Sequence, residues 1–309
     1  MITTLNLTKE YNGKKAVDNL NLEVVEGEVF GFLGPNGAGK STTILMLTGM
    51  IEPTSGTCMV NGVNVALDPL KGKEILGYLP EDVGFYKNLT GRENLDYIGK
   101  FYPMTTTERE ERIEVLLQKV ALRDVTQKVG EYSRGMNQRL GLALALLNDP
   151  DVIILDEPTA NLDPEGVLRY REIIKELAAE GKTIFICSHI LSEVRAVCNT
   201  LGIMSQGRLV ARGSVEEVEN ELIIQSRTPQ KIVIKAINPA VYEAIRSISN
   251  PDLIAINQTP AGIEVEVRQD IRAEIARELD GRSRGITEMY LERPGLEELF
   301  LKVYRREQG

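Results

Sequence analysis

Residue types suited to holding a phosphate group stand together near the amino terminus. They form one run in which glycine recurs and a lysine and a serine come last: Gly34, Pro35, Asn36, Gly37, Ala38, Gly39, Lys40 and Ser41. The run has the complete spacing of a phosphate-binding loop. Glycines let backbone N–H groups converge on phosphate oxygens, the lysine neutralises the β- and γ-phosphates, and the serine hydroxyl can ligate Mg²⁺. The alternative is a glycine-rich turn that matches by chance.

Two adjacent carboxylates, Asp156 and Glu157, follow the apolar run 152–155. An apolar strand that ends in two acids delivers both to the edge of the sheet where α/β folds bind ligands. Asp156 would hold Mg²⁺ and Glu157 would polarise the attacking water, because phosphoryl transfer depends on positioning and charge compensation. The alternative is a strand that ends in solvated acids, and the upstream phosphate loop disfavours it.

The only histidine of the chain, His189, follows another apolar run, 183–188. A lone histidine is more often a structural or surface residue than a ligand-binding one. Its place after the next strand beyond Asp156 and Glu157 puts it at the same edge of the sheet, so we predict that it contacts the γ-phosphate.

A second anion-binding feature is suggested by Ser133 and Gly135, which precede the apolar segment 140–147. They would lie at a helix N-terminus, where free N–H groups favour negative charge. By spacing alone, an ordinary capped helix is the preferred interpretation.

The elements around these residues alternate between strand and helix. The apolar run 29–33 precedes the phosphate loop, and a helix is expected after it over 41–50. The same order of strand and helix recurs later in the chain, with strands over 152–155 and 183–188 and helices over 164–180 and 191–198. This alternation favours a parallel sheet. The chain begins with strands over 2–7 and 20–24 around the turn residues Asn12 and Gly13. Between 87 and 132 the periodicity is helical, with start signals at Thr90…Glu93 and Thr107…Glu110.

A second domain is predicted after Gly213, where a capping-box helix starts at Ser214 and the polar stretch 225–230 follows. Strands over 231–237, 252–258, 262–268 and 285–292 and helices over 240–249 and 271–279 give a βαββαβ order. That order is typical of a small ferredoxin-like sandwich. A terminal helix is expected over 295–306.

Composition limits the possible partners. The net charge of −9 disfavours nucleic acid and anionic lipid, and the 42% hydrophobic and 26% charged shares are those of a globular protein. Three cysteines without metal-ligand spacing fit reduced thiols in the cytosol. The longest apolar run, 140–147, is too short to span a membrane, so a transport pathway would have to come from another polypeptide.

Taken together, these motifs resemble the ATP-binding subunits of ABC transporters, over residues 1 to about 220. The resemblance makes the phosphate loop, with Thr42, the Walker A motif and Asp156-Glu157 the Walker B motif. It further implies that Tyr11 stacks on adenine, that His189 is the switch histidine, and that Asp163, in the loop 161–163, crosses between subunits.

In this family the segment around Ser133 and Gly135 contacts the ATP held by the other subunit, so the resemblance implies a head-to-tail dimer around two nucleotides. Arg134 and Met136 replace the usual glycine and glutamine of that segment, and Glu81 replaces a glutamine that contacts Mg²⁺. These departures, and the ending 294–300, resemble the ABC-2 type exporter ATPases. A carboxylate at position 81 can still ligate Mg²⁺ but cannot donate a hydrogen bond unless protonated.

We therefore predict an α/β phosphate-loop NTPase core with an antiparallel β subdomain and a helical insertion (about 87–135), spanning 1–222, and an α+β ferredoxin-like domain spanning 223–309. The predicted function, on the resemblance, is an ATP-hydrolysing subunit that powers an ABC-type membrane exporter, with ATP and Mg²⁺ as cofactors. Its partners would be an integral membrane permease and a second ATPase subunit, identical or not, at the cytoplasmic face of the membrane. A soluble nontransport ATPase and an importer ATPase are the alternatives. The sequence does not name a transported substrate.

Overall fold

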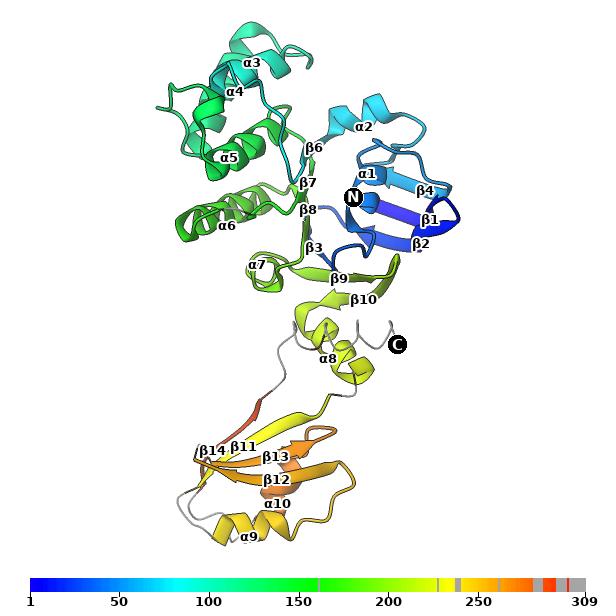
Figure 1. Ribbon diagram of the computed structural model, residues 1–309, viewed down its shortest axis with the longest axis vertical. Helices are drawn as coiled ribbons and strands as arrows, with labels where there is room; N and C mark the ends of the chain where they lie inside the picture. The colour runs from blue at the N-terminus through cyan, green and yellow to red at the C-terminus, as the bar shows by residue number, and fades with distance from the viewer. Residues whose placement is uncertain are drawn as a thin grey trace. The chain divides into compact units, whose positions relative to one another are not determined.

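The computed structural model describes residues 1–160, 162–226, 228–236, 240–260, 262–279, 286–292 and 299. The chain divides into two compact units, Met1–Val218 and Glu219–Gly309 (Figure 1). Among the described residues, no helix is long and apolar enough to cross a lipid bilayer. The predicted terminal helix over 295–306 lies outside the described residues, apart from Leu299.

A six-stranded sheet forms the centre of the first unit, in the order β10-β9-β3-β8-β7-β6. All neighbours are parallel except the pair β9 and β10. Its central strands consist of apolar residues buried on both faces, which is the pattern expected of a parallel sheet covered on two sides. The strands are β3 (Val29–Leu33), β6 (Leu76–Leu79), β7 (Val152–Asp156), β8 (Thr183–Ser188), β9 (Thr200–Ser205) and β10 (Arg208–Ser214).

An antiparallel sheet in the order β2-β1-β4-β5 forms a second layer. Its strands are β1 (Ile2–Tyr11), β2 (Lys14–Val24), β4 (Ser55–Val60) and β5 (Val63–Asn64). The predicted turn between β1 and β2 is confirmed: Asn12 and Gly13 have φ of 49° and 80°, and these two residue types tolerate the left-handed region best. One buried cluster, which includes Ile2, Phe32 and Ile44, joins this sheet, the central sheet and helix α1 (Lys40–Leu47).

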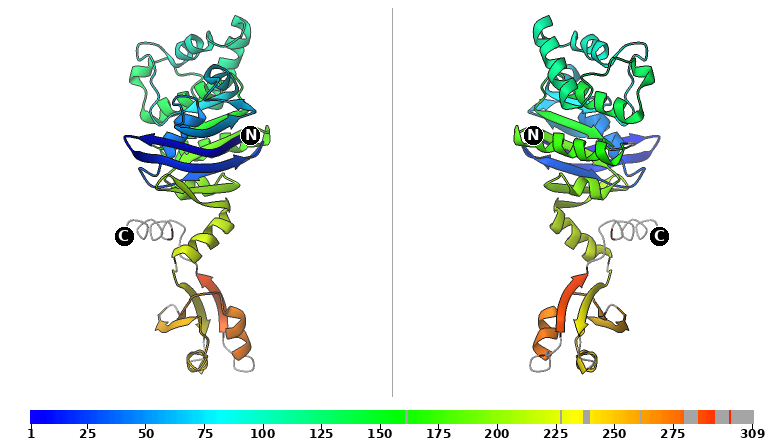
Figure 2. Two further views of the ribbon diagram at one scale, coloured as in Figure 1. Left: turned by 90° about the vertical axis from the view of Figure 1, so that its right-hand side faces the viewer. Right: turned by 90° about the vertical axis from the view of Figure 1, so that its left-hand side faces the viewer.

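Helices cover the remaining faces of the first unit, and those between β6 and β7 gather at one end of it (Figure 2). The helices between β6 and β7 are α3 (Gly91–Gly99), α4 (Thr106–Lys119), the 3₁₀ turn Val129–Glu131 and α5 (Arg134–Ala145). The others are α2 (Pro69–Ile75), α6 (Pro164–Ala179) and α7 (Leu191–Arg195).

The start of α3 is as predicted, but the start of α4 is not. Thr90 and Glu93 form a reciprocal capping box at α3. At α4 the box is made by Thr105 and Glu108, two residues before the predicted pair Thr107 and Glu110. In this helix the Arg109 Nε donates to Asp96 Oδ1 of α3 at 2.7 Å.

The second unit has the predicted βαββαβ order. Its sheet order, β12-β13-β11-β14, is antiparallel throughout and is that of a ferredoxin-like sandwich. A buried cluster that includes Ile234, Ile245, Val265 and Ile275 joins the sheet to α9 and α10. The elements are α8 (Val215–Ser226), which spans the division between the units, β11 (Gln230–Ala236), α9 (Ala240–Arg246), β12 (Leu253–Thr259), β13 (Gly262–Val267), α10 (Arg272–Glu278) and β14 (Ile286–Glu292).

Candidate functional site

Four neighbouring parallel strands end at one edge of the central sheet, and each carries a predicted site residue there. β3 leads into the phosphate loop, β8 into His189, β7 into Asp156 and Glu157, and β6 reaches Glu81 two residues after its end. The register pairs Asp156 with Cys187 and Leu79 with Leu155, so these ends are level. Topology thus gathers groups that are more than a hundred residues apart in the sequence.

The phosphate loop requires its glycines because other backbone groups approach it closely. Gly37 and Gly39 have φ of 80° and 105°, a region that side chains disfavour. A Cβ at Gly39 would lie 2.3 Å from the Ala16 carbonyl oxygen, and one at Gly34 would lie 2.5 Å from that of Met204. The loop therefore lies between residues of β2 and β9, with no room for side chains at Gly34 and Gly39.

Lys40 is 6% exposed and lies folded against its own loop. Its Nζ donates to the Gly34 and Pro35 carbonyl oxygens at 2.7 and 3.2 Å. Ser41 is exposed and Thr42 half-buried in the first turn of α1, which contains no acidic residue. The positive potential of this helix N-terminus is thus not neutralised by the helix's own side chains.

Asp156 is buried, at 6% exposure, and sits among other charges. Burial raises the pKa of its carboxyl, and the nearby carboxylates Glu157 and Glu81 raise it further; a hydrogen bond from the Cys187 thiol and the charge of Lys40 act in the opposite direction. The net effect of these contributions is a raised pKa, so a further cation nearby would stabilise the charged form of the carboxyl.

Glu157 is held from two sides. Its Oε1 lies 2.9 Å from His189 Nδ1, and its Oε2 accepts a hydrogen bond from Ser188 Oγ at 3.3 Å. Its backbone is left-handed, with φ of 47°, and its N–H donates to the Cys187 carbonyl oxygen at 2.9 Å. The side chain of His189 remains 54% exposed, so the pair has a buried member and an open one.

Three contacts of this edge were missed by the sequence analysis. Cys187 was assigned no role there, yet its thiol reaches Asp156. Ser188 was treated only as the end of a strand, and Thr159 was not considered, although its hydroxyl donates to Glu193 of α7. The only available signal was position: Cys187 and Ser188 are the last two residues of β8, and Thr159 lies three residues after the end of β7.

The other predicted residues lie at separate places in the first unit. Tyr11 ends β1 and is 47% exposed. Ser133 caps α5, accepting from the Met136 N–H at 3.2 Å, with Gly135 in the first turn. Asp163 caps α6, accepting from the Gly166 N–H at 2.8 Å, and Asn161 lies outside the described residues. Both Ser133 and Asp163 thus cap helices.

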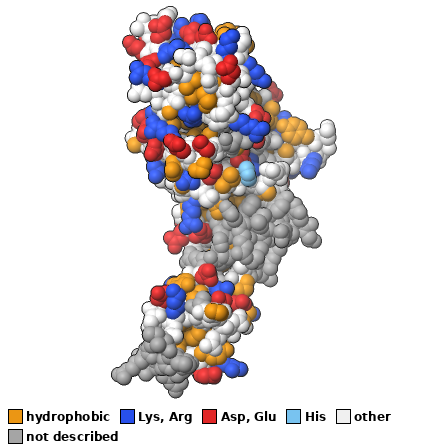
Figure 3. All heavy atoms as spheres, turned by 60° about the vertical axis from the view of Figure 1, so that its left-hand side comes forward, with side chains coloured by type: hydrophobic (Ala, Val, Ile, Leu, Met, Phe, Trp, Pro, Cys, Tyr) orange, Lys and Arg blue, Asp and Glu red, His pale blue; other side chains and the backbone are white. Residues whose placement is uncertain are grey.

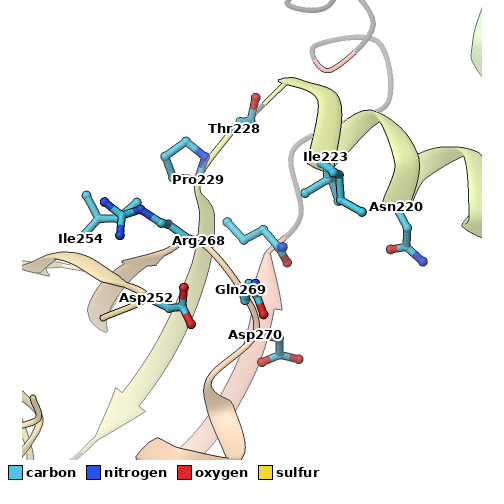
Figure 4. A pocket seen from close by; sticks show the side chains of 11 residues that line it. Asn220, Ile223, Thr228, Pro229, Asp252, Ile254, Arg268, Gln269 and Asp270 are labelled. Carbon is cyan, nitrogen blue, oxygen red and sulfur yellow. The ribbon is translucent and has the colours of Figure 1, made fainter. Parts of the chain in front are cut away.

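The second unit has a cavity of about 690 Å³ near the start of β11 (Figure 4). Arg268, Asp252 and Asp270 contribute charge to its lining. Arg268 donates to the Pro251 carbonyl oxygen at 2.8 Å and Asp270 pairs with Arg272, also at 2.8 Å. Basic and acidic side chains are likewise intermingled on the face drawn in Figure 3. Neither feature marks out a strongly charged ligand.

Within the described residues, no group of three or more His, Cys, Asp or Glu side chains is arranged to hold a metal ion by itself. The edge site nevertheless offers oxygen ligands of the type that Mg²⁺ prefers: the Ser41 hydroxyl and the Asp156 and Glu81 carboxylates. Magnesium usually combines one or two such protein ligands with phosphate oxygens of a nucleotide, so this set fits a nucleotide-bound ion.

A phosphate loop followed by a strand that ends in Asp-Glu, on a parallel sheet of this topology, defines a phosphate-loop ATPase. Comparison with known proteins identifies the family of ATPases to which the chain belongs. Residues 17–160 match the family model described as ABC transporter. The linearmycin resistance ATP-binding protein LnrL of Bacillus subtilis is 31% identical over 309 residues, 99% of each chain. The chain belongs to the ABC transporter ATP-binding proteins.

Two further comparisons agree. The bacitracin transport ATP-binding protein BcrA of Bacillus licheniformis is 46% identical over 212 residues, 68% of each chain. The solved dimer of the ATP-binding cassette MJ0796 bound to ADP and Pi is 26% identical, with a TM-score of 0.65 over 70% of this chain and 99% of that one. The predicted family, fold class and ATPase activity are confirmed: the chain is an ATP-binding, ATP-hydrolysing subunit of an ABC transporter.

Proposed function

We propose that this chain powers an exporter-type transporter, as a pair of ATPase subunits docked on a membrane permease at the cytoplasmic face. The observation that carries the proposal is the edge site, where Lys40, Asp156 and the Glu157–His189 pair converge. The departures at Glu81, Arg134 and Met136 favour an exporter over an importer, and the names of LnrL and BcrA, which refer to resistance and transport, support it over a soluble nontransport ATPase.

The phosphate loop would bind the β- and γ-phosphates of ATP. Lys40 exchanges its two loop carbonyl contacts, at 2.7 and 3.2 Å, for phosphate oxygens, which are better acceptors because they carry charge. Ser41 and Thr42 add hydroxyls at the N-terminus of α1. Tyr11 would stack on the adenine.

Glu157 would polarise the water that attacks the γ-phosphate. The bond that forms joins the water oxygen to the γ-phosphorus, and the bond that breaks joins that phosphorus to the oxygen bridging to ADP. Ser188 and His189 hold one carboxylate oxygen each, which fixes the direction in which Glu157 accepts a hydrogen bond from the water. His189, being exposed, is free to contact the γ-phosphate as well.

Ser41, Asp156 and Glu81 would hold Mg²⁺ together with the nucleotide. When bound, the ion neutralises charge on the β- and γ-phosphates. The raised pKa of Asp156 supports this role, since a carboxylate that is costly to ionise alone is stabilised by a cation.

Two copies would complete each site. Ser133 Oγ accepts a hydrogen bond from the Met136 N–H within the first turn of α5, and the N–H of Gly135 in the same turn would serve a phosphate of the opposite subunit. Asp163 would lie in the segment that crosses between the subunits. MJ0796 forms a dimer as a cassette, which supports the same arrangement here.

The permease would contact a cluster of exposed aromatic residues that follows Glu81. Tyr86 and Tyr97 pack edge to face with ring centroids 5.0 Å apart, and Tyr97 and Phe101 do so at 5.8 Å. Their exposures of 49%, 41% and 74% leave an apolar surface open to a partner. It begins five residues beyond Glu81, so nucleotide contacts could be transmitted to it along a short segment.

The test is the substitution Glu157→Gln in the full-length chain. We expect ATP binding to persist and an ATP-bound dimer to accumulate, while turnover falls by at least about a hundredfold, the usual contribution of a positioned general base. Gel filtration with light scattering and a phosphate-release assay measure both. His189→Ala should lower turnover as well.

Glu111→Gln, an exposed glutamate of α4 outside the proposed ATP site, serves as the matched control and should keep normal turnover. Unchanged turnover in Glu157→Gln would refute the assigned chemistry. Affinity purification that recovers no membrane protein would favour the soluble alternative instead.

A further inference from the structure

Lys9 and Tyr11 stand two positions apart at the end of β1, where its pairing with β2 is irregular. The Lys9 ammonium lies over the Tyr11 ring, 5.2 Å from its centroid. The same Nζ donates to the Glu52 carbonyl oxygen at 2.7 Å. The ammonium is thus tied to a segment 43 residues further along the chain.

This second contact distinguishes Lys9 from an ordinary surface lysine. A free lysine side chain samples many rotamers and spends little time over a neighbouring ring. Here the Glu52 carbonyl anchors the charged end, so the cation stays against one side of a ring that is still 47% exposed. One side of Tyr11 is occupied and the exposed remainder is available to a flat ligand.

We propose that Lys9 is a positioning residue for nucleotide recognition: it holds the Tyr11 ring and strengthens its stacking on the adenine of ATP. The faces of an aromatic ring carry negative charge, and a cation on one face withdraws part of it. The opposite face then repels the electron-rich purine less. This inference rests on the proposed role of Tyr11 and goes beyond it.

The expected consequence concerns binding and leaves the chemical step unchanged, because Lys9 acts through Tyr11 and the edge site lies elsewhere. An exposed cation–π pair is weak, so its loss should raise the dissociation constant and KM for ATP about two- to fivefold. The turnover number should stay within about twofold of the original.

Four variants of the full-length chain separate this effect from loss of the Glu52 contact: Lys9→Met, Lys9→Arg, Tyr11→Ala and the double variant. Calorimetric titration with ATP gives the dissociation constant, and steady-state phosphate release gives KM and the turnover number. Lys73→Met, which removes an exposed lysine from α2, is the control for charge alone.

We expect Lys9→Met to weaken ATP binding, Lys9→Arg to restore it, and Lys9→Met to add nothing in the Tyr11→Ala background. A penalty that persists in that background would show that Lys9 acts through Glu52 and would overturn the inference. So would a Lys9→Met variant that binds ATP normally while Tyr11→Ala binds it poorly. If Tyr11→Ala itself binds ATP normally, the adenine assignment and the inference are both wrong.

Discussion

The surroundings of Asp156 disfavour the charged form of its carboxyl. It is buried, two other carboxylates lie near it, and Lys40 offsets them only in part. A cost of this kind is common at ligand sites, where stability and activity oppose each other, and it fits the proposed role of Asp156 in holding Mg²⁺ beside the nucleotide. At the scale of single residues, function is therefore visible as an unfavourable arrangement in the free protein.

Asp156→Asn should accordingly stabilise the nucleotide-free protein while abolishing turnover. Because the folded-state pKa of Asp156 is raised, its cost is fully present above that pKa and disappears as pH falls through it. The gain in Tm should be on the order of 2–4 °C at neutral pH and should shrink in acid. Differential scanning calorimetry across pH measures it, and equal or lower Tm for Asp156→Asn at neutral pH would contradict the argument.

Elements that bury apolar runs on both faces were predictable from the sequence. β3 and β8 match the predicted bounds, and β7 extends one residue beyond them, because their residues have no alternative but the centre of a sheet. β4 was missed because its first residues, Ser55 and Gly56, are exposed and have no apolar side chain. β9 and β10 were missed although Gln206 and Gly207 form a left-handed turn between them.

The positions of the candidate site residues at strand ends were predictable, but the contacts between them were not. Sequence position placed Glu157 and His189 at strand ends, since the apolar runs before them are unambiguous. That they meet at 2.9 Å depends on β7 and β8 being neighbours, which is a property of strand order. Strand order is set by packing of the whole sheet, so local patterns could not reveal it.

The start of α4 shows which of two possible capping boxes the chain forms. Three threonines and two glutamates allow two capping boxes, and the one formed uses Thr105 with Glu108. Thr105→Ala should therefore lower the free energy of unfolding by about 1 kcal/mol, the usual cost of losing an N-cap. Thr107→Ala lies inside the helix and should cost less. Urea denaturation of both variants measures the two losses of stability. A larger loss for Thr107→Ala than for Thr105→Ala would instead support the capping box of Thr107 and Glu110.

At the scale of the whole molecule, the two units have buried clusters with no residue in common. The first cluster supports the nucleotide site through Phe32, which precedes the phosphate loop, and Ile44, which follows it. The second is built around β11 and β13. Because each unit buries an apolar core of its own, each meets the main physical requirement for an independent unfolding transition.

Ile234→Ala tests that independence. Ile234 is fully buried in the central strand β11, so its truncation should cost about 2–5 kcal/mol in the second unit. We expect its transition to fall by about 10 °C or more, since a unit of this size loses roughly 4–8 °C per kcal/mol. ATP with Mg²⁺, which we propose to bind at the phosphate loop of the first unit, should raise only the transition of that unit, as ligand linkage requires. A single transition that the variant and ATP shift together would instead mean that the units unfold as one, and the nucleotide site would then draw stability from the ferredoxin-like sheet.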